Sequence, residues 1–90
     1  MKETAMKLTV DLYQDVILTV DLPEHGLRAG DVGTVVERHD VPGKEVGYSV
    51  EFFDMTGRTV AVATLSSSLL RAPTSSDRPT ARQLAGAVGS

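Results

Sequence analysis

The chain contains no cysteine among its 90 residues. Disulfide bonds, thiolate zinc sites and thiol catalysis are therefore excluded, and the lack of cysteine fits a reducing cytoplasm. No apolar run approaches the roughly 18 residues of a membrane-spanning helix. The basic residues near the N-terminus are not followed by the apolar stretch of a signal peptide, because Asp11 and Gln14 interrupt it. We therefore expect a cytoplasmic protein with no contact to a membrane.

Clusters of lysine and arginine are also missing. The formal net charge is −3, and residues 8–73 hold ten acidic side chains against five basic ones. A protein surface with an excess of acids repels the phosphate backbone and cannot release many counterions from it. The charge distribution therefore predicts that the chain does not bind nucleic acid.

The residues that are present indicate one small globular domain, since 41% of them are hydrophobic. Alternation of apolar and polar residues, with many β-branched side chains, predicts four strands. They are expected at residues 15–20, 31–38, 47–53 and 58–65. In the last of these, Val60 and Val62 are expected to face the core. The serines of residues 66–71 favour one turn of 3₁₀ helix before a last short strand, and whether residues 8–12 also pair is left open.

Glycine and proline mark the connections between these strands. The first connection, residues 21–30, is a long loop whose Leu22 and Leu27 are expected to fold back over one end of the core. Gly33 would weaken a strand, so a bulge or a close approach of two backbones is expected there. Residues 54–57 predict a hairpin, with Gly57 in the left-handed backbone conformation.

These elements predict an all-β fold, a small five-stranded SH3-like barrel over residues 8–73. Closure of the sheet would protect its edges. An open five-stranded sheet with one exposed face is the alternative. Residues 1–7 are expected to be a flexible leader, and residues 74–90 a disordered or weakly helical tail behind a proline- and serine-rich boundary.

Three stretches of the chain resemble a known family. They are residues 15–36, with the pattern Leu-Pro-x-x-Gly-Leu-x-x-Gly-Asp-x-Gly-Thr-Val, residues 48–54 and residues 60–65. They are similar to small bacterial proteins catalogued as the four-thousand-nine-hundred-and-twenty-sixth domain of unknown function in its series. The resemblance implies an SH3-like barrel but transfers no activity and no catalytic residues. Fainter similarities connect the chain to the barrels of nitrile hydratase β-subunits and their activator proteins.

No motif in the sequence carries catalytic or metal-binding chemistry. The two histidines, His25 and His39, have no further ligands at the short spacing of a metal site. The serines of residues 66–68 have no base placed by a recognisable motif. The glycines of residues 30–33 lack the spacing and the lysine of a phosphate-binding loop. We therefore predict no catalytic residue, no metal site and no cofactor.

The remaining candidates are residues that could contact a protein partner. In the first loop these are Glu24, His25 and Arg28, and at the hairpin tip they are Phe53 and Met55. An exposed aromatic ring beside a methionine is typical of a binding hot spot. The alternative is that Phe53 packs under the tail or the first loop.

The hypothesis that follows is a non-enzymatic protein-interaction module, such as an accessory, immunity-type or antitoxin-type subunit. One alternative is an assembly or activator factor for a metalloenzyme, which rests on fold similarity alone. A further alternative is a nucleic-acid-binding barrel. Homo-oligomers formed by edge pairing or tail docking are left open.

Overall fold

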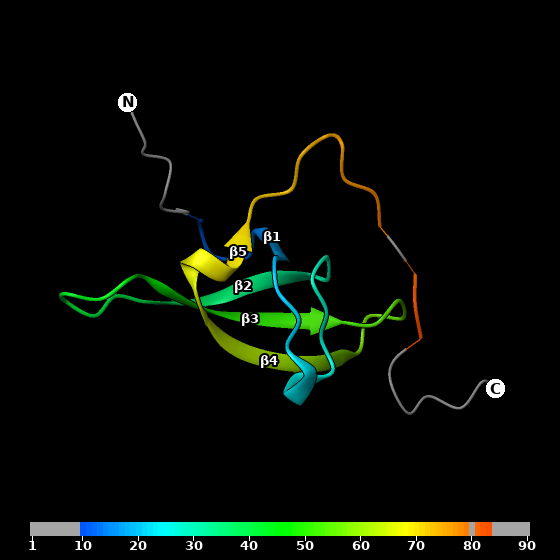
Figure 1. Ribbon diagram of the computed structural model, residues 1–90, viewed down its shortest axis with the longest axis horizontal. Coiled ribbons are helices and arrows are strands. Elements are labelled where there is room, and N and C mark those ends of the chain that lie inside the picture. The colour runs from blue at the N-terminus through cyan, green and yellow to red at the C-terminus, as the bar shows by residue number, and fades with distance from the viewer. Residues whose placement is uncertain (1–9, 80, 84–90) are drawn as a thin grey trace.

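A computed structural model describes residues 10–79 and 81–83 of the chain. Its strands are β1 (Asp15–Leu18), β2 (Val32–His39), β3 (Gly47–Phe53), β4 (Thr59–Ser66) and β5 (Leu70–Arg71), and two short 3₁₀ helices, η1 (Pro23–His25) and η2 (Ser67–Leu69), lie between them. All neighbouring strands are antiparallel, in the order β4-β3-β2-β1-β5. The sheet curls into a half-barrel (Figure 1). The all-β, five-stranded prediction is confirmed, and within the described part no helix is long and apolar enough to span a membrane.

The hydrophobic core lies inside the curl of the sheet. In β3 the side chains of Tyr48, Val50 and Phe52 are all buried, as the alternating pattern predicts. They pack with buried residues of the other strands, of the first loop and of the segment before β1, namely Val10, Val16, Leu18, Leu27, Val35, Ala63, Leu65 and Leu70. Tyr48 also accepts a hydrogen bond at its hydroxyl from the backbone N–H of Val10, at 3.2 Å. This bond attaches the segment before β1 to the centre of the core.

Strand β4 presents the opposite face to that expected. Ala63 and Leu65 are buried, whereas Val60 is partly exposed and Val62 is 55% exposed. The prediction that the two valines face the core is therefore wrong. The reason is register: Leu65 pairs with Tyr48 and Ala63 with Val50, so directly opposed residues share the inner face.

Gly33 approaches the neighbouring strand closely. Of the two expectations for this glycine, a bulge or a close approach of two backbones, the structure shows the close approach. A Cβ atom placed on Gly33 would lie 2.5 Å from a methyl carbon of Val50 and 2.9 Å from the ring of Phe52. The irregularity in the pairing of β2 with β3 lies further along, between Val35 and Glu37. Gly33 is thus required by the packing of the core.

The first loop folds back as expected. Leu22 and Leu27 form a bridge to each other, and Leu27 is buried against the core while Leu22 packs at its edge. Two carboxylates hold the loop: Asp21 accepts from the N–H of Ala29 and Asp31 from the N–H of Arg28, each at 2.9 Å. The loop is therefore a built part of the structure, beside the start of β2.

Two expectations concern the ends of the described chain: whether residues 8–12 pair is left open, and the tail is predicted to be disordered or weakly helical. Residues 10–14 contain no strand; they turn at Leu12 and Tyr13, and the N–H of Tyr13 donates to the carbonyl of Val35. Residues 8 and 9, and the leader before them, lie outside the described residues. Residues 81–83 are not helical, and most of the segment with helical potential, residues 80–88, also lies outside the described part.

Candidate functional site

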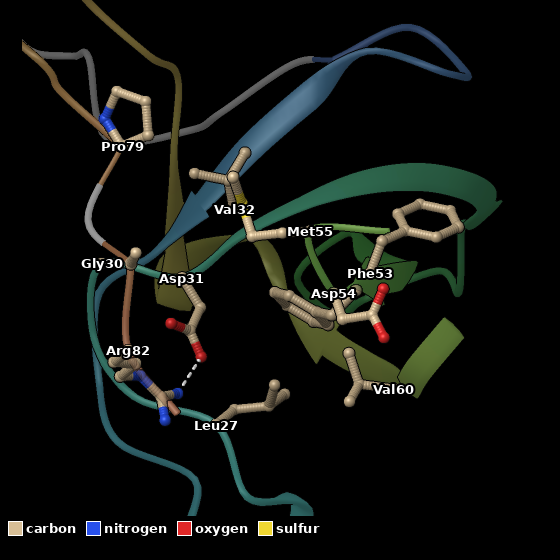
Figure 2. A pocket seen from close by; sticks show the side chains of 12 residues that line it. Leu27, Gly30, Asp31, Val32, Phe53, Asp54, Met55, Val60, Pro79 and Arg82 are labelled. Carbon is tan, nitrogen blue, oxygen red and sulfur yellow. Dashed lines mark hydrogen bonds and ion pairs between the residues drawn. The ribbon is translucent and has the colours of Figure 1, made fainter. Parts of the chain in front are cut away.

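A groove of about 200 Å³ opens between the first loop, the start of β2, the β3–β4 hairpin and the described tail (Figure 2). Its lining comes from all four segments: Leu27, Gly30, Asp31, Val32, Phe52, Phe53, Asp54, Met55, Val60, Pro79, Ala81 and Arg82. Segments far apart in the sequence therefore meet here, because the curl of the sheet brings the hairpin towards the first loop.

The hairpin side of the groove is apolar. Phe53 is 42% exposed and Met55 is 86% exposed, and Val32 and Val60 beside them also remain accessible. Leu27 and Phe52, which are buried in the core, also line the groove. Monomeric proteins seldom expose apolar side chains in a contiguous group unless the group binds something. The groove can therefore take up an apolar side chain.

The hairpin tip that presents Met55 is held by the carboxylate of Asp54. Its Oδ1 atom accepts hydrogen bonds from the N–H and hydroxyl of Thr56, at 2.8 and 2.7 Å, and from the N–H of Arg58, at 3.0 Å. These bonds, first of all the one from the Thr56 hydroxyl, lower the pKa of Asp54. Gly57 has a φ of +88°, so the predicted left-handed turn residue is confirmed.

The tail closes the opposite side of the groove. Arg82 forms an ion pair with Asp31 at 2.6 Å, and the same nitrogen lies 3.4 Å from the carbonyl oxygen of Gly26. The two side chains are only 25% and 24% exposed, respectively. Nearer to β5, Arg71 binds both carboxylate oxygens of Asp77, which also accepts from Thr74. The described tail is thus attached to the domain at two points.

The structure brings together only some of the residues predicted to bind a partner. Phe53 and Met55 both line the groove, next to tail residues. Glu24, His25 and Arg28 are exposed on the first loop and do not line it. The groove also contains Val32, Val60, Asp31 and Arg82, which were not predicted from the sequence. No local motif marks these residues, since only the fold places them beside the hairpin tip.

A row of polar side chains on the outer face of the sheet also escaped the sequence analysis. His39 Nε2 lies 2.8 Å from the hydroxyl of Ser49, which lies 3.0 Å from the hydroxyl of Thr64. Glu37 approaches the same histidine nitrogen, at 3.8 Å. In a catalytic triad the carboxylate binds the other ring nitrogen and orients the base. The row is therefore a set of cross-strand contacts, and it differs from a triad in the placement of its acid.

No group of three or more potential metal ligands gathers within residues 10–79 and 81–83. The acids named above serve the backbone instead, because Asp21, Asp31 and Asp54 each accept bonds from N–H groups of their own loops. These carboxylates stabilise the two segments that form the groove.

Comparison with known proteins identifies the domain. No curated protein and no solved structure matches the chain significantly, so the narrower prediction of an SH3-like barrel stays a prediction. A family model matches residues 12–72, which include all five strands and most of the groove. The chain belongs to the family described as domain of unknown function DUF4926.

Proposed function

We propose that this chain is a non-enzymatic protein-interaction module, and that its groove binds the partner. The observation that supports this is the meeting of Phe53 and Met55 with Val32 and Val60 along one groove. Aromatic residues are enriched among the residues that dominate binding energy, and methionine adapts to irregular surfaces. The module would serve as an accessory, immunity-type or antitoxin-type subunit.

The size of the groove indicates how a partner would use it. An apolar cavity of about 150 Å³ is large enough for benzene, so a groove of about 200 Å³ accepts one large apolar side chain. A specific interface buries roughly 800 Å² on each partner. The groove would therefore hold the central anchor of the interface, and the surrounding hairpin and loop surfaces would supply the remaining area.

The charge of the domain supports the choice of a protein partner. Residues 8–73 carry twice as many acids as bases, which disfavours nucleic acid and attracts basic protein surfaces. We also propose a cytoplasmic location, which the lack of cysteine supports.

A capture experiment with matched variants tests the proposed function. The full chain is immobilised and exposed to a lysate of its native host, and the captured protein is identified by mass spectrometry. The same capture is repeated with the double variant Phe53→Ser/Met55→Ser, with Met55→Ser alone, and with Val62→Ser. Val62 is also apolar and is 55% exposed, but it does not line the groove.

We expect one protein to be captured by the wild type and by Val62→Ser and to be lost with the groove variants. Because Met55 is 86% exposed, Met55→Ser leaves the fold intact and keeps the test meaningful. Equal capture by the wild type and both groove variants, or capture of no protein at all, would contradict the proposal.

A further inference from the structure

One end of the groove already holds an arginine that belongs to the chain itself. Arg82 reaches Asp31 at 2.6 Å (Figure 2). The same guanidinium nitrogen lies 3.4 Å from the carbonyl oxygen of Gly26. Asp31 is mostly covered and is held in place by the N–H of Arg28. A preformed, partly desolvated acceptor of this kind binds a guanidinium more firmly than an exposed ion pair would.

The tail fills the rest of the groove poorly. The other described tail residues that line it are Pro79 and Ala81, and the groove beside them has a volume of about 200 Å³. The hairpin side of this space carries the apolar side chains of Phe53 and Met55, with Val32 beside them, and Asp54, whose carboxylate is bonded to the hairpin backbone, also lines it. The described residues of the tail thus satisfy the acidic end of the groove and do not fill the apolar end.

These two observations define a ligand better suited to the groove than the tail. Such a ligand has an arginine at the position of Arg82 and a large apolar residue in place of Ala81. It would form the ion pair with Asp31 and also bury apolar surface against the hairpin, which contributes in proportion to the area removed from water.

We propose, on the basis of the proposed function, that the groove is a docking surface for an extended partner segment in which a large apolar residue precedes an arginine. In the free chain, Pro79, Ala81 and Arg82 occupy this surface as an internal competitor, and the partner displaces Arg82 from Asp31. The apparent affinity of the partner is then reduced by the fraction of molecules in which the tail is docked.

Fluorescence anisotropy with synthetic peptides and the full chain tests this inference. The probe is a labelled peptide with the sequence of residues 76–83 carrying Ala81→Leu. We expect the Arg82→Ala chain to bind it about 3- to 10-fold more tightly than the wild type, because the tail no longer competes. Arg78→Ala is the matched control, since within the described residues Arg78 hydrogen-bonds only the carbonyls of Ser75 and Asp77 and does not line the groove.

Changes in the peptide test each half of the recognition without altering the fold of the protein. Replacing its arginine, Arg82→Gln, is expected to weaken binding to the Arg82→Ala chain at least about tenfold, because the charge-assisted bond to Asp31 is lost. Restoring the natural alanine at position 81 is expected to weaken it about tenfold through lost apolar burial. Asp31→Asn in the Arg82→Ala chain should reproduce the first effect.

Equal binding to the wild-type and Arg82→Ala chains would overturn the inference, as would equal binding of the arginine and glutamine peptides. Light scattering tests whether the tail docks on a second copy of the chain instead. A wild-type dimer that becomes a monomer with Arg82→Ala would show such docking and would contradict an internal competitor. If host capture depends on Phe53 and Met55 while no peptide binds, this inference fails and the proposed function survives. If neither the capture of the host protein nor the binding of the peptides changes with the groove variants, this inference and the proposed function both fail.

Discussion

Gly33 lies directly against the ring of Phe52, its register partner on the neighbouring strand. A Cβ atom at this position would be 2.9 Å from two ring carbons and 2.5 Å from a methyl carbon of Val50. All of these groups are buried, so neither side chain can move away without disturbing its other contacts. The lack of a side chain at Gly33 therefore allows β2 to pack closely against Val50 and Phe52.

From this contact we predict that Gly33→Ala destabilises the domain by about 1–3 kcal/mol, the usual range for overpacking a dense core. The free energy of unfolding in a denaturant titration measures the effect. Gly47→Ala is the control, because a Cβ there would meet its nearest atom, the carbonyl oxygen of Leu65, at an ordinary 3.6 Å. Equal stability of the two variants would show that the approach of Gly33 to Phe52 is not tight.

A second prediction concerns the hydroxyl of Tyr48, which is fully buried and accepts a bond from the N–H of Val10. Tyr48→Phe should lower the free energy of unfolding by about 1–3 kcal/mol, because the buried N–H loses an acceptor. The other tyrosine, Tyr13, is 72% exposed and supplies the matched control. Tyr13→Phe should change stability by less than about 0.5 kcal/mol, and a larger effect there than at Tyr48 would refute the assignment.

The third prediction tests whether Val62 of β4 lies outside the core. Val50 of the neighbouring strand β3 is fully buried and Val62 is 55% exposed, so the same substitution should have different effects. Val50→Ala is expected to destabilise the domain by about 2–3 kcal/mol through lost burial and a small cavity. Val62→Ala should change stability by less than about 1 kcal/mol. A large loss at Val62, measured by thermal or denaturant unfolding, would restore the interpretation made from the sequence.

The buried face was predicted correctly for β3 and wrongly for β4, and both outcomes have one physical explanation. In β3 the large apolar residues alternate with Ser49 and Glu51, so only one face of the strand is apolar. In β4 both faces carry apolar residues, and their pattern alone does not choose between Val62 and Ala63. The choice follows from pairing with Tyr48 and Val50, and pairing between strands is not visible in the sequence of one strand.

Only the part of the candidate site that is local in the sequence could be predicted, because contacts between distant segments depend on the fold. Phe53 and Met55 are close in the sequence, so a local interpretation of the hairpin places them together. Arg82 and Asp31 are 51 residues apart, and no periodicity connects them. The polar row through Ser49 likewise depends on register, because Ser49 meets Glu37 on one side and Thr64 on the other. Contacts of this kind become visible only in the folded chain.

A final prediction concerns the acid at the first attachment of the tail. Bonds from the Arg71 guanidinium, followed by those from the Thr74 N–H and hydroxyl, hold the pKa of the Asp77 carboxyl well below its ordinary value of 3.8. Because the pKa is lower in the folded state, the stabilisation from this group is present above about pH 4 and is lost as the pH falls through the folded-state pKa. The attachment should therefore persist at neutral pH and open only in acid.

Carboxyl-detected NMR titration of Asp77 measures this pKa directly. With Arg71→Gln it should rise towards the ordinary value, because the largest favourable interaction of the ionised form is gone. Arg78→Gln removes an equal charge one residue away, but in the described part of the chain Arg78 donates only to the backbone carbonyls of Ser75 and Asp77. That control should move the pKa much less. Similar shifts in both variants would mean that general charge, and not the ion pair with Arg71, sets the titration of Asp77.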